Sequence, residues 1–301
     1  MKLTILGCYS ATPRIISQTT AQLLETRGHH FLIDCGEGTQ IELRRYKLKF
    51  NQIKHIFISH LHGDHYFGLI GLISTFRLLK READLYIYGP KGIRDIINLQ
   101  LKLSKSWTDF KLFFHELEST DSECIFEDDK VSVYTIPLIH RIYTNGFLFV
   151  EKAFDRKLNI EKAEEKNIDK AYFRKLKQGS DVLNRDGIFI KNAEVTSKGV
   201  KPKSYAFCSD TAYSEAIVPI IKSVDALYHE STFLESHESL CIYTKHSTAK
   251  QAATIAKKAE VGTLILGHYS SRYKDLRLFK SEAETVFRHV ELATDGKVFA
   301  I

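Results

Sequence analysis

The chain has 301 residues, of which 44% are hydrophobic and 27% charged, as in an ordinary globular protein that can bury a sizeable core. The formal net charge of +6 suits a polyanionic partner, although many soluble proteins are mildly basic. The five cysteines are scattered without a CxxC pair, so neither a disulfide framework nor a thiolate zinc site is indicated, and we expect a reducing, cytoplasmic location. No run approaches the roughly 20 apolar residues of a membrane span, so we expect no membrane association.

Short apolar runs recur along the chain, and their length and β-branched and aromatic content predict strands. Residues 65–80 predict a helix whose broad apolar face includes Phe67, Phe76 and Leu79. Residues 247–259 predict a second helix, which opens with a Ser/Thr cap. Strands mixed with helices in both halves predict an α/β layered fold. The predicted strands are residues 3–6, 30–33, 55–59, 85–88, 131–136, 146–150, 205–208, 226–228 and 263–266.

The segment HLHGDH at residues 60–65 follows a predicted strand and precedes a predicted helix. It crowds three imidazoles and a carboxylate into six residues, and zinc readily takes both kinds of ligand. In an extended loop alternate positions point the same way, so His60 and His62 can share one metal while Asp64 and His65 turn toward a second. A chance His-rich turn would explain a single HxH, but it does not explain the full HxHxDH pattern.

Three further residues follow predicted strands. His140, Asp210 and His268 each lie just past the end of an apolar run. In α/β sheets, ligands collect beyond the carboxyl ends of strands. Any one of the three alone would be read as a structural histidine or a turn residue. All three at strand ends, in a chain with HxHxDH, indicate one metal centre.

Residues 151–203 differ from the rest of the chain because they are rich in charge and poor in strand pattern. They contain 14 Lys and Arg against nine Asp and Glu, a net charge of +5, so most of the chain's net charge lies in this segment. A solvated surface excursion is the ordinary explanation of such a charge run. The alternative is a basic arm that binds a nucleic-acid backbone.

Several local segments resemble those of the metallo-β-lactamase superfamily, and within it those of the ribonuclease Z family of tRNA 3′-processing endonucleases. The HxHxDH motif marks the superfamily, whereas HEST at 229–232 and HST at 246–248 are more specific to the nucleases. The resemblance covers residues 1–150 and 204–273. The other similar segments are DCGEGTQ at 34–40, YGPKG at 88–92, SDT at 209–211 and HYSSRY at 268–273.

This resemblance implies an α/β fold, a four-layer αββα metallo-β-lactamase sandwich over residues 1–301 with the basic arm, 151–203, inserted in its second half as a substrate exosite. It also implies two Zn²⁺ ions, with Mn²⁺ or another divalent ion as a possible substitute. His60, His62 and His140 would hold one ion, Asp64, His65 and His268 the other, and Asp210 would bridge them. Asp34 would order the ligand loop or cap a turn.

The resemblance also implies the reaction and its partners. The protein would remove the 3′ trailer from precursor tRNA and leave a tRNA 3′-hydroxyl and a trailer 5′-phosphate. Asp64 would take part in catalysis, and His246, oriented by Glu230, would give a proton to the leaving oxygen. A homodimer is expected, and Arg174, Lys175 and Lys177 of the arm are expected to contact the tRNA. The alternative is another binuclear-zinc hydrolase of this fold, such as a small-molecule phosphodiesterase, an arylsulfatase or a thioesterase.

Overall fold

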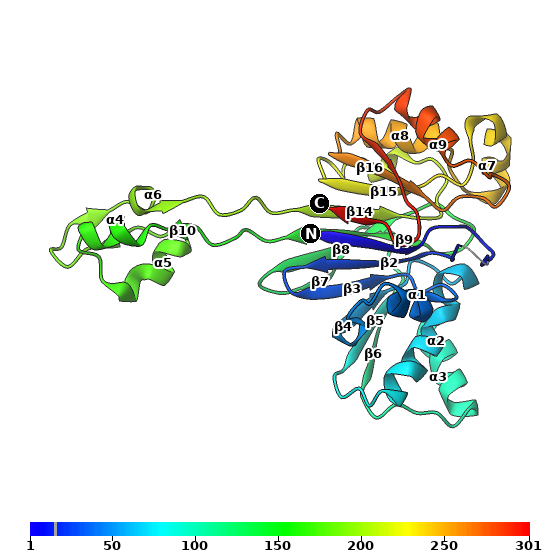
Figure 1. Ribbon diagram of the computed structural model, residues 1–301, viewed down its shortest axis with the longest axis horizontal. Coiled ribbons are helices and arrows are strands. Elements are labelled where there is room, and N and C mark those ends of the chain that lie inside the picture. Colours follow the sequence, from blue (N-terminus) through cyan, green and yellow to red (C-terminus); the bar gives the residue numbers. More distant parts are fainter. Residues whose placement is uncertain (15–16) are drawn as a thin grey trace. The chain divides into compact units, whose positions relative to one another are not determined.

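The computed structural model describes residues 1–14 and 17–301. The chain forms two compact units, which we describe separately. The larger unit comprises Met1–Val150 and Lys203–Ile301, and the smaller comprises Glu151–Pro202 (Figure 1). Among the described residues, no helix is both long enough and apolar enough to span a bilayer.

Two seven-stranded mixed sheets make up the centre of the larger unit. In the first sheet the order is β18-β1-β2-β3-β4-β5-β6, antiparallel from β18 to β3 and parallel from β3 to β6. Its strands are β1 (Lys2–Gly7), β2 (Ala21–Thr26), β3 (His29–Ile33), β4 (Ile53–Phe57), β5 (Leu85–Pro90), β6 (Leu112–Leu117) and β18 (Val298–Ala300).

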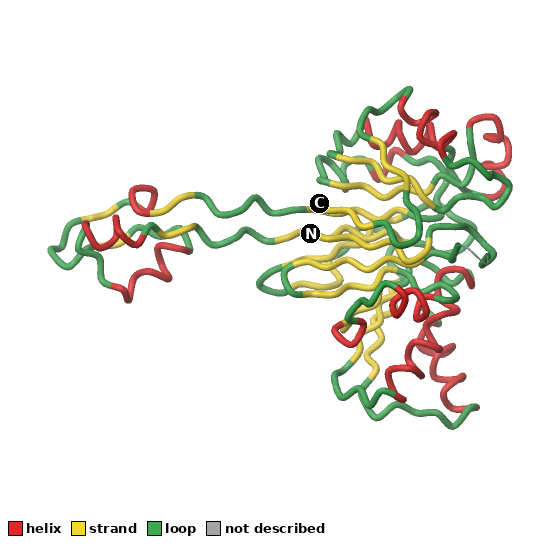
Figure 2. Tube along the Cα trace, viewed as in Figure 1, coloured by secondary structure: helices red, strands yellow, loops and turns green. Residues whose placement is uncertain are grey.

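The second sheet has the order β17-β16-β15-β14-β9-β8-β7, and β14 to β17 run parallel. The parallel strands of each sheet direct their carboxyl ends, and the loops that follow, to one end of that sheet. Figure 2 shows the strands of the larger unit in yellow and the loops that connect them in green. Its strands are β7 (Cys124–Glu127), β8 (Val131–Pro137), β9 (Asn145–Glu151), β14 (Ser204–Cys208), β15 (Ala226–Glu230), β16 (Thr263–Gly267) and β17 (Val290–Leu292).

Aromatic side chains fill the space between the sheets. Phe31 of β3 packs on Phe149 of β9, and Phe57 of β4 packs on Phe147 of β9, each pair with ring centroids 5.4 Å apart. All four rings are fully buried. Packing of this kind joins the inner faces of two sheets into one core.

Helices cover the two outer faces of the sheets (Figure 1). A second apolar cluster packs α1 to α3 on the first sheet, while α8 and α9 pack on the second sheet. The four layers confirm the predicted αββα sandwich. The helices are α1 (Thr39–Arg45), α2 (Gly63–Leu78), α3 (Ile93–Leu103), α7 (Glu238–Thr244), α8 (Ala249–Lys258) and α9 (Arg277–Glu284), with 3₁₀ turns η1 (Phe50–Gln52), η3 (Glu215–Ile217) and η4 (Glu235–His237).

The structure corrects three details of the predicted elements. The predicted strand 55–59 is β4, which ends at Phe57, because the Ser59 amide leaves the ladder to donate to Asp34. On α2 the predicted apolar face was partly wrong, since Phe67 and Leu79 are exposed. Five strands of the larger unit were not among the predicted strands: β2, β6, β7, β17 and β18.

The smaller unit has a core of its own, although its sequence predicted only a charged excursion. Short helices and two-residue strands surround six buried apolar residues: Ala163, Ile168, Leu176, Val182, Ile190 and Val195. The elements are β10 (Lys157–Leu158), α4 (Ile160–Glu165), η2 (Lys170–Tyr172), α5 (Phe173–Lys177), β11 (Val182–Leu183), β12 (Phe189–Ile190), α6 (Asn192–Val195) and β13 (Thr196–Ser197).

Candidate metal centre

The candidate ligands come from the ends of strands in both sheets. His60 and His62 lie in the loop after β4, and Asp64 and His65 lie in the first turn of α2. From the second sheet, the loops after β8, β14 and β16 supply His140, Asp210 and His268. The fold therefore brings all seven predicted ligands into one cluster of the larger unit.

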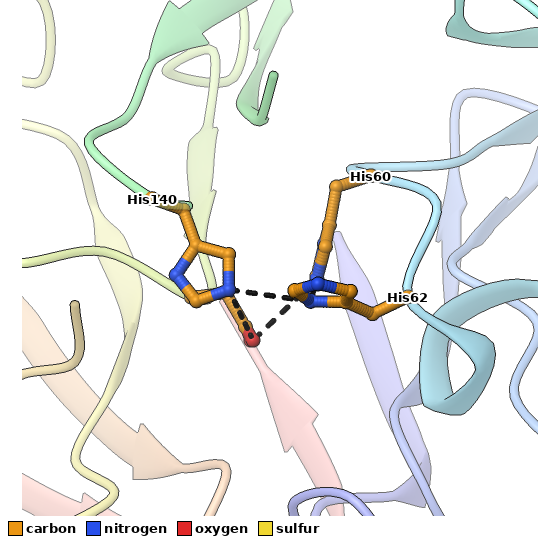
Figure 3. Close-up of side chains that lie close together, drawn as sticks. His60, His62 and His140 are labelled. Carbon is orange, nitrogen blue, oxygen red and sulfur yellow. Dashed lines mark hydrogen bonds and ion pairs between the residues drawn. The ribbon is translucent and has the colours of Figure 1, made fainter. Parts of the chain in front are cut away.

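The first group of donors is His60, His62, His140 and Asp210, whose ligand atoms lie within 4.8 Å of one another. Nδ1 of His62 is 3.0 Å from Nε2 of His60 and 3.3 Å from Nε2 of His140 (Figure 3). Two imidazoles on one tetrahedral zinc, with Zn–N bonds of about 2.0–2.1 Å, place their nitrogens about 3.3 Å apart. The donor spacing thus fits a shared cation.

The second group is Asp64, His65 and His268, also within 4.8 Å. Nε2 of His65 and Nε2 of His268 are buried, and neither makes a hydrogen bond. Oδ1 of Asp210 lies 3.3 Å from Nε2 of His65 and 3.0 Å from Nε2 of His268, but not in a direction that forms a hydrogen bond. A buried polar atom without a partner is unfavourable unless another group binds it. A divalent cation would satisfy both nitrogens.

Asp210 faces both groups through different oxygens. Its Oδ2 lies 3.5 Å from Nε2 of His60 and 3.7 Å from that of His140, while Oδ1 faces His65 and His268. Burial alone would raise the pKa of Asp210, but the imidazoles of His268, His65 and His60 outweigh it and hold that pKa well below its ordinary value. An ionised carboxylate in this position can bridge two cations.

Asp34 anchors the ligand loop. Its Oδ2 lies 2.7 Å from Nδ1 of His65, and its Oδ1 accepts a 2.7 Å hydrogen bond from the Ser59 amide. The Ser59 hydroxyl donates to Asp34 and lies 3.0 Å from Nδ1 of His60. One buried carboxylate therefore holds two ligand rings with their Nε2 atoms toward the cluster.

Glu230 of β15 plays the corresponding part on the second sheet. It is fully buried and accepts hydrogen bonds from the Thr211 amide (3.1 Å) and from the Thr232 amide and hydroxyl (2.9 and 2.7 Å). The same Thr232 hydroxyl is 3.0 Å from Nδ1 of His268. Glu230 thus also orients a ligand, through Thr232.

Glu230 also contacts His246. Nδ1 of His246 donates a 2.8 Å hydrogen bond to Oε1 of Glu230. Burial alone would lower the pKa of His246, but the charge and hydrogen bond of Glu230 outweigh it and raise that pKa to about 9. His246 also lies close to Asp210 and His268. Because a metal ligand must be deprotonated, an imidazole kept cationic suits proton donation better than coordination.

Four of the candidate ligands, His62, Asp64, Asp210 and His268, line a cleft of about 490 Å³ together with residues that the sequence did not single out. Arg141 and Arg272 bring positive charge to it, and Phe67 and Phe233 bring aromatic surface. The guanidinium of Arg272 lies 5.4 Å from the ring centroid of Phe233. Arg141 directly follows His140, and Arg272 lies within the HYSSRY segment that begins at His268. Their positions near candidate ligands were the sequence signal that could have identified them as cleft residues. Such a lining suits a phosphate beside a base.

The predicted tRNA contacts lie in the smaller unit. Arg174, Lys175 and Lys177 are on α5, and all three side chains are exposed. No acidic partner is in ion-pair contact with them among the described residues.

Two stacked mixed sheets, outer helices and a His/Asp cluster at the strand ends define a protein of the metallo-β-lactamase fold with a divalent-metal site. The structure of the metallo-beta-lactamase fold protein YhfI from Bacillus subtilis matches this fold with a TM-score of 0.69 over 99% of this chain and 98% of that chain, at 18% identity. The chain belongs to the ribonuclease Z family: Ribonuclease Z from Cytophaga hutchinsonii is 48% identical over 100% of this chain and 96% of that protein.

A solved structure agrees with this assignment, and a family model covers the first half of the chain. The crystal structure of human tRNase Z, short form, matches with a TM-score of 0.74 and 29% identity over 100% of this chain and 99% of that chain. Residues 1–162 match the family model described as anti-Pycsar protein Apyc1. That match includes the HLHGDH segment and His140 but ends before Asp210, Glu230, His246 and His268. The full-length relatives therefore define the family of the whole chain.

Proposed function

We propose that this protein is a metal-dependent endonuclease that removes the 3′ trailer from precursor tRNA, leaving a tRNA 3′-hydroxyl and a 5′-phosphate on the trailer. The observation that carries the proposal is one cleft in which two groups of metal donors lie beside the His246–Glu230 pair. Full-length relatives named Ribonuclease Z support the same reaction. A hydrolase that needs only the metals would not require a buried carboxylate to keep a nearby imidazole protonated.

The cofactors are two divalent cations, which we assign as Zn²⁺ because five imidazoles and two carboxylates form mixed N/O sites; Mn²⁺ can use the same donors. His60, His62 and His140 would hold one ion, Asp64, His65 and His268 would hold the other, and Asp210, which faces both groups, would contribute to both. Bound there, the ions would activate water as the nucleophile and stabilise the charge that develops on the phosphoryl oxygens.

The protein's own groups do the remaining work. When water attacks the phosphorus, the bond to the ribose 3′-oxygen breaks, and that oxygen needs a proton. His246 is protonated at neutral pH and its ring borders the cleft, so it gives the proton from Nε2, while Glu230 holds Nδ1. Arg141 and Arg272 pair with the phosphates that flank the cut, and Phe67 and Phe233 pack against bases.

The smaller unit, Glu151–Pro202, is in this proposal the arm that binds tRNA away from the cut. Its net positive charge and the exposed Arg174, Lys175 and Lys177 of α5 support this role. Contacts of this kind position folded RNA without reading its sequence.

We further propose that the protein acts as a homodimer in the cytoplasm. Apolar side chains are exposed at the carboxyl ends of α2 and α3 and just beyond, which supports a second copy as the partner: Leu78, Leu103 and Trp107. The five cysteines are all free thiols, which suits a reducing compartment.

The decisive experiment incubates the metal-loaded protein with a precursor tRNA of defined trailer and maps the cut and its end groups. A single cut near the discriminator nucleotide that leaves the stated termini supports the proposal. Intact precursor together with rapid hydrolysis of bis(p-nitrophenyl) phosphate would instead identify a small-molecule phosphodiesterase.

A further inference from the structure

The β11–β12 hairpin of the smaller unit exposes apolar side chains on one face. Val182 pairs with Ile190 and Leu183 pairs with Phe189. Val182 and Ile190 are buried in the unit's core, whereas Leu183 is 53% and Phe189 59% exposed. Ile188, which precedes Phe189, is 58% exposed. Because directly opposed residues share a face, Leu183 and Phe189 form a continuous apolar surface in water.

The turn beneath this surface is rigidly built around Asn184. The Asn184 carboxamide oxygen accepts hydrogen bonds from the amides of Asp186 (3.0 Å) and Ile188 (2.8 Å). The Asn184 amide donates to the Ile188 carbonyl at 2.9 Å, and Asn184 Nδ2 donates to the Lys166 carbonyl at 3.0 Å. These four hydrogen bonds, three from the side chain and one from the backbone, fix the conformation of the hairpin loop.

The same turn is tied to the connection between α4 and η2. The Arg185 amide donates to the Asn167 carbonyl at 3.1 Å, and Nδ2 of Asn167 donates to Asp186 at 2.9 Å. The Arg185 guanidinium pairs with Asp169 at 3.1 Å. The polar groups of the tip are therefore paired within the unit, with the exposed Arg185 guanidinium held by Asp169, while the apolar side chains of Leu183, Ile188 and Phe189 stay exposed beside them. Holding an apolar surface in one geometry lowers the entropy lost on binding.

We propose that Leu183, Ile188 and Phe189, the hairpin face, pack against unstacked nucleobases of the folded RNA substrate, with the ring of Phe189 stacked on a base. The inference rests on the proposed function and adds a second kind of contact to the arm. The unit's charge favours RNA as the occupant, since Glu151–Pro202 contains 13 Lys and Arg against nine Asp and Glu, a net charge of +4, and the exposed Arg174, Lys175 and Lys177 can contact phosphates. RNA loops offer bases whose faces are open for stacking.

A protein partner fits the hairpin face less well. A stable protein interface uses about 20–30 residues on each side, and this face offers three. A nucleobase is matched in size to one aromatic ring and the aliphatic side chains beside it, so three residues suffice for it.

The test measures precursor tRNA binding to the full-length, metal-loaded protein across a series of salt concentrations. Stacking makes no ion pair, so Phe189→Ala should weaken binding about 10-fold while the slope of log Kd against log salt stays as in the wild type. Lys175→Ala should instead reduce that slope by about one. Phe189→Trp should restore the affinity, because it keeps an aromatic face.

Ile160→Ala is the matched control, because Ile160 is a similarly exposed apolar residue at the start of α4 in the same unit. It should bind RNA as the wild type does, and thermal unfolding should show that every variant is folded. Wild-type affinity of Phe189→Ala would overturn the proposal, and so would a loss that Phe189→Trp does not restore. A lower mass of Phe189→Ala in light scattering, with RNA binding unchanged, would also overturn it and identify a protein contact. If the wild type itself fails to bind precursor tRNA, the proposed function fails first.

Discussion

At the metal centre of the larger unit, the candidate ligands are buried or half-buried and several are held by hydrogen bonds, whereas the basic side chains of α5 in the smaller unit are exposed. Asp34 and Glu230 are both fully buried, and each positions a ligand ring and a neighbouring group. Arg174, Lys175 and Lys177 have no such support. Activity depends on one fixed arrangement of side chains in the cleft, so we expect substitutions there to abolish most of it. The arm offers several similar contacts, so we expect changes there to be graded and sensitive to salt.

Three residues of the metal centre have an unusual backbone conformation. Asp34, Asp210 and His268 adopt left-handed conformations with φ of 55°, 56° and 59°, which are uncommon for residues other than glycine. Each lies just after a strand, where the chain turns sharply so that a side chain points into the cluster. Strain of this kind persists where the surrounding structure enforces it, and it often marks functional sites.

The largest effect is expected from Asp210→Ala, which removes the carboxylate that, among the described residues, faces both donor groups. Metal content, measured by plasma mass spectrometry, should fall from two ions per chain to one or none. Cleavage of precursor tRNA should fall by more than the roughly 10²–10⁴-fold typical of losing a general acid. Asp129→Ala, which removes an exposed carboxylate outside the cleft, is the control. Two bound ions and normal turnover in Asp210→Ala would remove the basis for a bridged centre.

His246→Ala tests whether the His246–Glu230 pair acts on the leaving group. Without a proton donor, kcat for precursor tRNA should fall roughly 10²–10⁴-fold. Hydrolysis of bis(p-nitrophenyl) phosphate should change only a few-fold, because its leaving group departs without a proton. His289→Ala, an exposed histidine in the larger unit, controls for loss of an imidazole. Equal losses on both substrates would mean that His246 supports the metal centre instead.

The two regions also differ in how much their sequence predicted. The residues of the metal cluster could be singled out because their spacing is local, as in HLHGDH, or because they directly follow apolar strands, as His140 and Asp210 do. The cleft residue Phe67 could not, because its place in the cleft depends on which distant loops meet. Phe67 in particular fits the apolar period of α2, yet it lies in the cleft and is exposed.

The fold of the smaller unit could not be predicted from its sequence, for a physical reason. Its helices and strands span two to six residues, too few to show the period of a helix or a strand. Its core residues, such as Ala163, Leu176 and Val195, are therefore separated by charged residues without a visible pattern. The sequence could predict that this part of the chain is basic, but not its core or the hairpin face. Its role in binding tRNA stays a prediction.

A third prediction concerns pH. Glu230→Gln keeps the size of the side chain but removes its charge, so the pKa of His246 should fall from about 9 toward its ordinary 6.5. The protonated donor is then lost at lower pH, and the basic limb of log kcat/KM should move down by more than one unit. Stability should depend on pH in the same direction. Because folding raises the pKa of His246, the stabilisation from the His246–Glu230 pair is complete below about pH 6.5 and disappears as the pH rises through about 9. A basic limb that stays in place would separate Glu230 from proton transfer.

The smallest effect is expected from replacing Arg174, Lys175 and Lys177 of α5 together by Ala. Precursor tRNA should bind roughly 10-fold more weakly, and the slope of log Kd against log salt should fall by about 0.9 for each lost phosphate contact. Turnover at saturating RNA should stay near the wild type, because the cleft is untouched. The matched control replaces three exposed lysines of the larger unit: Lys47, Lys49 and Lys54. If both triple variants lose affinity equally, general attraction by net charge is enough to explain binding. If only the α5 variant loses affinity, phosphate contacts are concentrated in the smaller unit, which can then hold tRNA while the cleft cuts it.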